Sequence, residues 1–122
     1  MTEFSHDLTH DGLNIKTVIT ETTATLSWTG YSEMRTPETV LNPFFKNLLP
    51  FLRGKSLVVD FLGFDFMSSA TQGPILQFLK NLDKNKIPVR VIYNTKLEWQ
   101  RVSYRCMKVL FRTMPQIQFE CV

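Results

Sequence analysis

Two adjacent serines, Ser68 and Ser69, are the side chains best placed to carry chemistry in this sequence. They lie in the stretch FDFMSSATQGPILQFLK, between a strand-like segment and an amphipathic helix. Ser69 and Gln72 match the S-x-x-Q capping box, in which the serine hydroxyl accepts a hydrogen bond from a free backbone amide. A serine at this joint could instead be a point of regulation, because a phosphate is tolerated at a helix N-terminus. Pro74 indicates a loose first turn, or a helix that begins nearer Gln72.

Other groups of reactive side chains give weaker signals. His6, Asp7, His10 and Asp11 have the spacing of metal ligands on a helix, but no third element completes a shell, so we favour a frayed end and expect no metal site. His6 and His10 are the two histidines of the chain, so no histidine lies near Ser69 in the sequence to act as a general base. The P-loop, G-x-S-x-G, H-E-x-x-H and G-x-G-x-x-G motifs are missing from the sequence. We therefore expect a protein that is not an enzyme and needs no cofactor.

Basic residues recur along the last predicted helix, at Arg101, Arg105, Lys108 and Arg112. Their i, i+4, i+7, i+11 spacing predicts one basic stripe. A solvated helix face explains the stripe most simply, and an acidic protein partner bound by Arg101 and Arg105 is the functional alternative. We consider nucleic acid unlikely as a partner, because no recognition motif accompanies the stripe.

Charge and composition narrow the class of protein further. The net charge of +3 divides unevenly: residues 1–54 carry four Lys/Arg against six Asp/Glu, and residues 55–122 carry ten against five. No apolar run approaches the roughly 20 residues of a membrane span, so no membrane partner is expected. The polar N-terminus is unlike a secretory signal, and the two cysteines lack C-x-x-C spacing. These features predict a cytoplasmic protein with reduced thiols.

The elements that must position the serines alternate along the chain. Apolar patterning predicts five strands, over 13–20, 23–30, 56–62, 87–93 and 116–122. Helices are predicted over 36–54, after the serine pair, and over 95–114. The order β-β-α-β-α-β-α-β predicts one α/β domain over 1–122, with a mixed, mostly parallel sheet and about three helices. Residues 1–12 are predicted to be a flexible N-terminus, and 56–62 a central strand buried on both faces.

The apolar stripes of two helices predict which faces are buried. In 36–54, one stripe supplies a docking face: Leu41, Phe45, Leu48 and Leu52. Phe44 and Phe51 lie on a second stripe and are therefore predicted to be at least partly exposed and to add contact area for a partner. In 95–114 the predicted inner stripe, opposite the basic one, is Trp99, Val102, Cys106, Val109 and Leu110. This pattern makes Cys106 a small core residue.

The segment LVVDFLGFDFMSSATQGPIL resembles the signature of STAS domains, the family of anti-sigma-factor antagonists. That signature has an apolar strand ending in Asp, a short loop, an apolar residue, Asp or Asn, Ser, Ser or Thr, and Gly before a helix. The segment WQRVSYRCMKVLFRTMPQIQFE is similar to the last helix and strand of a STAS-like regulator subgroup. The order of elements along the whole chain also agrees with that fold.

The resemblance implies a partner-switching regulator. In the family, a dedicated serine kinase phosphorylates the serine after the Asp/Asn, and a PPM-type phosphatase restores it. Ser69 aligns with the phosphoacceptor, Ser68 with the Asp/Asn and Asp60 with the strand-end Asp, while Ala70 and Thr71 replace the second hydroxyl and the glycine. Ser68 is the runner-up phosphoacceptor, since the alignment could be displaced by one residue.

Three functions are compatible with this sequence. The first is a signalling protein that binds a partner, such as an anti-sigma-like kinase, under the control of Ser69, with Asp60, Ser68 and Thr71 supporting the site. The second is a constitutive interaction or scaffold module in which the serines only cap a helix. The third is a sensor for a small ligand in the crevice at the carboxyl ends of the strands.

Overall fold

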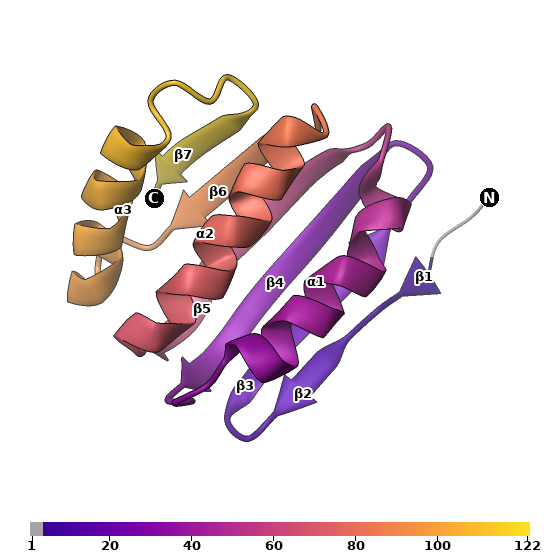
Figure 1. The fold of residues 1–122 in the computed structure, drawn as a ribbon. Helices are drawn as coiled ribbons and strands as arrows, with labels where there is room; N and C mark the ends of the chain where they lie inside the picture. The colour runs from indigo at the N-terminus through magenta and orange to yellow at the C-terminus, as the bar shows by residue number, and fades with distance from the viewer. Residues whose placement is uncertain (1–3) are drawn as a thin grey trace.

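The computed structural model describes residues 4–122, in which one mixed sheet is covered by a layer of three helices (Figure 1). The elements are β1 (Phe4–Ser5), β2 (Leu8–His10), β3 (Leu13–Ile19), β4 (Thr23–Ser32), α1 (Glu38–Leu52), β5 (Ser56–Met67), α2 (Ser69–Lys84), β6 (Val89–Tyr93), α3 (Glu98–Leu110) and β7 (Ile117–Cys121). The predicted α/β class and the alternation of strands and helices are confirmed.

The two strands predicted over 13–20 and 23–30 form an antiparallel hairpin. β3 and β4 pair antiparallel, from Leu13 opposite Gly30 to Ile19 opposite Ala24. Thr20 and Thr23 close the turn, since the Thr20 amide donates to the Thr23 carbonyl at 2.8 Å and the Thr23 amide donates to Thr20 Oγ1 at 3.1 Å. The Thr20 hydroxyl thus helps to close a turn that contains no Asn-Gly pair.

The strand order places all helices on one face of the sheet. The order is β1-β3-β4-β5-β6-β7, with β2 also paired to β3, and β4 to β7 run parallel. Right-handed crossovers between strands that are added in sequence order bring α1, α2 and α3 to the same face (Figure 1). The opposite face is open, and Val58 and Asp60 on it are half-buried. The prediction that 56–62 is buried on both faces is therefore wrong.

The N-terminal segment differs from its prediction. Residues 1–3 lie outside the described part, but β1 and β2 pair antiparallel with β3. The Asp7 carboxylate also accepts a hydrogen bond from the Thr17 amide at 3.0 Å. The expected flexible N-terminus is thus corrected from residue 4 onward, since pairing with β3 satisfies its backbone.

Helix α1 confirms one predicted exposure and corrects the other. Leu41, Phe45, Leu48 and Leu52 are buried, as predicted, and Phe51 is 45% exposed. Phe44 is only 7% exposed, so the prediction that it is partly exposed is wrong. The N-terminal segment explains this, because the His6 ring stacks on the Phe44 ring with centroids 5.6 Å apart.

Aromatic rings join the helix layer to the sheet. The buried Trp28 ring of β4 lies 6.1 Å from Phe45 of α1, and 5.5 and 5.3 Å from Phe61 and Phe64 of β5. Phe45 in turn stacks on Phe78 of α2 at 4.0 Å between centroids. These contacts hold α1 and α2 against β4 and β5, the strand that leads to the serines.

Candidate functional site

Strand β5 pairs with β6 only over the first part of β5. The pairing of β5 with β6 ends at Asp60 opposite Ile92, whereas β5 continues to Met67 beside β4 with two shifts of register. Such shifts are β-bulges, which redirect a strand. Asp60 stabilises the first of them, because its Oδ1 accepts a hydrogen bond from the Leu62 amide at 2.8 Å. Asp60 therefore lies in mid-strand and not at the strand end, as the resemblance implied.

The carbonyls that β5 would have offered to β6 are bonded by α3 side chains instead. Gln100 Nε2 donates to the carbonyls of Phe61 and Phe64, at 2.7 and 2.9 Å. Trp99 Nε1 donates to the Asp65 carbonyl at 2.8 Å. Gln100 is fully buried, so water does not reach the carbonyls that it bonds. The side-chain bonds take the place of water, because a buried carbonyl without a donor is costly.

This role of Gln100 determines which face of α3 is buried. Gln100, Ser103 and Met107 point inward, and Ser103 Oγ lies 3.1 Å from the Tyr93 hydroxyl. Burial raises the pKa of Tyr93 to about 12, although the bond to Ser103 acts in the opposite direction.

The predicted inner stripe of α3 is consequently wrong. Val102 is 55% exposed, Val109 66% and Leu110 56%, and Cys106 is exposed as well. Trp99 is the exception, since it is half-buried against β5. The helix is rotated by about one residue position, roughly 100°, from the orientation that its apolar residues predicted.

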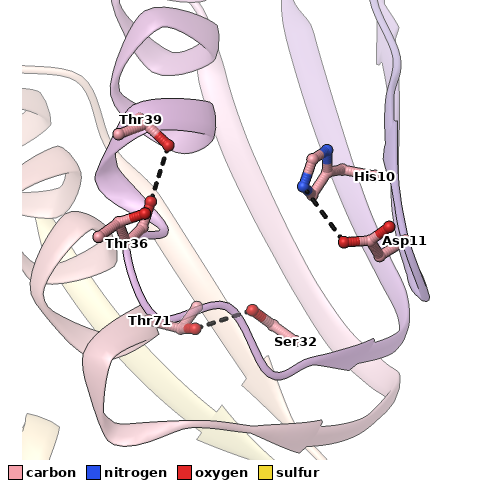
Figure 2. A network of polar contacts seen from close by, with 6 residues as sticks. All are labelled: His10, Asp11, Ser32, Thr36, Thr39 and Thr71. Carbon is pink, nitrogen blue, oxygen red and sulfur yellow. Dashed lines mark hydrogen bonds and ion pairs between the residues drawn. The ribbon is translucent and has the colours of Figure 1, made fainter.

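At the serine joint, Ser68 and not Ser69 belongs to the polar network. Ser68 has extended backbone geometry and precedes the first helical residue, Ser69. Its hydroxyl donates to the Met34 carbonyl at 3.3 Å and lies 2.9 Å from Thr71 Oγ1. Thr71 Oγ1 lies 2.8 Å from Ser32 Oγ, and Figure 2 shows these two side chains pointing toward one another. The hydroxyls form a continuous chain that ties α2 to the end of β4.

The capping box, one of the two interpretations of Ser69, is therefore wrong. The regular helix begins at Ser69 despite Pro74, and Ser68 takes the N-cap position. Thr71 is fully buried, so it supports the joint from inside and offers no surface to a partner.

Ser69 is exposed, and its hydroxyl makes no hydrogen bond to any residue of the described range 4–122. It lies on the rim of an open groove of about 660 Å³ between the start of α2 and the side of α3. The lining residues are Met67, Ser69, Gln72, Glu98, Trp99, Val102, Ser103 and Cys106. We call this feature the α2–α3 groove. The apolar part of its lining comes mainly from the α3 face that sequence reasoning assigned to the core.

The remaining predicted residues lie at other places. Arg101 and Arg105 are exposed on α3, the helix that lines the groove. Phe51 lies near the C-terminal end of α1, away from the start of α2 (Figure 1). The structure therefore brings Ser69 together with α3, but brings neither Asp60 nor Phe51 to it.

A second hollow, on the other side of the joint, is polar. Its lining includes His10, Asp11, Tyr31 and Glu33, and Figure 2 shows His10 pointing to Asp11, with 3.4 Å between Nε2 and Oδ2. In the part of the chain that the structure describes, no group of three His, Cys, Asp or Glu side chains could hold a metal ion.

Neither a scan against protein-family models nor a search of curated proteins finds a match to this chain. The resemblance to STAS domains therefore stays a prediction. Across residues 4–122, no helix has the length and apolar character needed to cross a membrane.

Proposed function

We propose that this protein is a non-enzymatic regulatory domain, similar to anti-sigma-factor antagonists, that binds a partner protein under the control of Ser69 phosphorylation. One observation supports this proposal above the others. Ser69 combines an exposed hydroxyl, free of hydrogen bonds within residues 4–122, with a place at the rim of the partly apolar α2–α3 groove. Ser68, by contrast, is held in the hydroxyl chain.

The position of Ser69 allows phosphorylation without refolding. As the first residue of α2, it lies beside backbone amides that have no partner in the helix, at the positive end of the helix dipole. A phosphate placed there meets favourable electrostatics. Ser69 is also exposed, so the added group displaces no packed side chain.

A partner docked in the groove would respond to the phosphate strongly. Burying a group with nearly two negative charges costs several kcal/mol unless the charges are paired. A change of about 3 kcal/mol already alters affinity more than a hundredfold. In this proposal a serine kinase and a PPM-type phosphatase set the charge, and Asp60 contributes only by fixing the bulge of β5.

Phosphopeptide mapping and affinity capture together test the proposal. Protein isolated from its native cells should carry phosphate on Ser69. In native lysate, Ser69→Asp should lose the captured partner while its melting temperature matches that of the wild type, and Ser69→Ala should keep the partner. Phosphate on neither serine, with unchanged capture by Ser69→Asp, would refute the switch and leave a constitutive interaction module.

A further inference from the structure

Helix α3 exposes two faces of different character, which are adjacent and not opposite as predicted, because Val102 follows Arg101 and Val109 follows Lys108 at about 100° per residue. The first is an apolar strip, which we define as Val102, Cys106, Val109 and Leu110, at i, i+4, i+7 and i+8. Val102 and Cys106 also line the α2–α3 groove. The second face is the basic stripe, which we define as Arg101, Arg105, Lys108 and Arg112 and whose members are all exposed.

The fold does not use the apolar strip. The inward face of α3 is completed by Gln100, Ser103 and Met107, with Phe111 buried just after the helix. The aliphatic side chains of the strip are each more than half exposed, and no residue in the range 4–122 covers them. Single exposed apolar residues are common, whereas a contiguous exposed strip beside a groove is typical of a docking surface.

The basic stripe also lacks ion-pair partners within residues 4–122. No member forms an ion pair with any residue of the described part, where the two pairs found are His10–Asp11 and Arg90–Glu120. Arg101 donates to the Thr95 carbonyl at 2.8 Å, and Lys108 lies 5.2 Å from the centre of the Tyr104 ring. The guanidinium groups of Arg105 and Arg112 have no polar partner within residues 4–122.

We propose that the apolar strip and the basic stripe together bind one amphipathic helix of the partner protein, with acidic residues along the edge that faces the stripe. The inference rests on the proposed function, because it names the partner of the same groove. A strip from Val102 to Leu110 is about 12 Å long and one helix face wide, the dimensions of helix-in-groove recognition. The free cations beside it select acidic residues by charge complementarity.

The distribution of charge along α3 also predicts the orientation of the bound helix. Glu98 and Ser69 lie at the N-terminal end of α3, whereas Arg105, Lys108 and Arg112 lie further along the helix. Acidic residues of the partner are therefore expected over the later turns of α3 and excluded near Glu98. Phosphate on Ser69 would add negative charge at the rim, and would repel an acidic helix as well as occupying part of its space.

Three synthetic helical peptides test this inference directly. All would carry leucine at i, i+3, i+4 and i+7, and the flanking positions would be glutamate, glutamine or lysine. Fluorescence anisotropy with the full unphosphorylated chain should show the glutamate peptide binding about tenfold more tightly than the glutamine peptide, and the lysine peptide most weakly. Amide chemical shifts in NMR spectra should change at Val102, Cys106 and Val109.

Substitutions distinguish the contribution of the apolar strip to peptide binding from that of the basic stripe. Val109→Ser with Leu110→Ser should remove binding of all three peptides, and Arg105→Glu with Arg112→Glu should reverse the order of preference. Lys80→Glu with Lys84→Glu, on the exposed surface of α2, is the matched control and should leave the order unchanged. All six residues are exposed, so the melting temperatures should stay near that of the wild type.

Several outcomes would overturn the inference. These are equal affinity for the three peptides, no binding of any of them, shifts confined to the open sheet face, or binding to phosphatidylserine vesicles in preference to the glutamate peptide. The assay uses no kinase, so it is independent of whether Ser69 is phosphorylated in cells. Tight glutamate-peptide binding that Ser69→Asp does not weaken would refute the control by phosphorylation and leave the helix site intact.

Discussion

At the scale of single residues, the two serines differ in what they contribute to stability. The Ser68 hydroxyl joins the Met34 carbonyl to Thr71 in the hydroxyl chain, so Ser68→Ala should lower the free energy of unfolding by about 1–2 kcal/mol. The Ser69 hydroxyl makes no hydrogen bond within residues 4–122, so Ser69→Ala should change the free energy of unfolding by less than about 0.5 kcal/mol. Urea denaturation measures both. A larger loss at Ser69 than at Ser68 would contradict the assigned roles.

Tyr93 makes the stability depend on alkaline pH. Burial raises its pKa from 10.0 to about 12, so the folded protein keeps the phenolic proton where the unfolded chain loses it. Stability is therefore complete below about pH 10 and falls as the pH rises from 10 to 12, by roughly 3 kcal/mol in total.

Denaturation midpoints measured across that pH range would check this expectation. Tyr93→Phe should be less stable at neutral pH, because it loses the bond to Ser103, yet lose less stability on going to pH 12. An equal alkaline loss in wild type and Tyr93→Phe would show that Tyr93 is not responsible.

At the scale of elements, α3 shows where reading the sequence for apolar periodicity fails. Its apolar residues form one clear stripe, and the usual rule places such a stripe inside. The structure turns that stripe outward, because the bulged half of β5 has carbonyls that need a donor, and Gln100 supplies it. That requirement comes from a strand almost 40 residues earlier, so no local pattern in α3 could reveal it. The available signal was the similarity of the segment that begins with Trp99 and Gln100 to the last helix of STAS-like regulators, but this similarity did not indicate the role of Gln100.

The importance of Gln100 can be measured with a substitution of similar size. Gln100→Leu would leave two buried carbonyls, of Phe61 and Phe64, without donors. Each such group costs about 1–3 kcal/mol, so the free energy of unfolding should fall by roughly 2–6 kcal/mol. Val102→Leu, on the exposed face of the same helix, is the control and should be nearly neutral. A loss below about 1 kcal/mol at Gln100 would mean that the carbonyls find other donors.

The two phenylalanines of α1 offer a matched comparison. Phe44 is buried against the N-terminal segment, so Phe44→Ala should destabilise the protein by about 3–4 kcal/mol. Phe51 is 45% exposed, and Phe51→Ala should cost about 1 kcal/mol or less. Thermal and urea denaturation would rank them, and similar losses at both positions would contradict the burial that separates them.

At the scale of the whole molecule, the order of the elements could be predicted from the sequence far better than which of their faces are buried. Alternation of apolar residues located the hairpin and the strands, because period-2 patterning follows directly from one buried face. The open face of the sheet was missed because Val58, which is only half-buried on that face, is an apolar residue. The α2–α3 groove was also missed, because its shape depends on how α2 and α3 pack on the bulged part of β5, and no local sequence pattern describes that packing.

The strand order has a consequence for how the protein is made. From β3 to β7 the strands neighbour one another in the order in which they are synthesised. Each strand leaving the ribosome can therefore extend the growing edge of the sheet without waiting for later sequence. The last part of β5 is different, because the carbonyls of Phe61 and Phe64 require Gln100.

We therefore expect the segment leading to Ser69 to be completed last, although it is synthesised before β6. A chain ending at residue 96 should keep β3 to β5 resistant to protease and be cleaved readily within residues 61–67. Equal protection of that segment in the truncated and full chains would contradict this order of assembly. If this order and the proposed phosphorylation of Ser69 both hold, a kinase that recognises the finished geometry would act only on released chains.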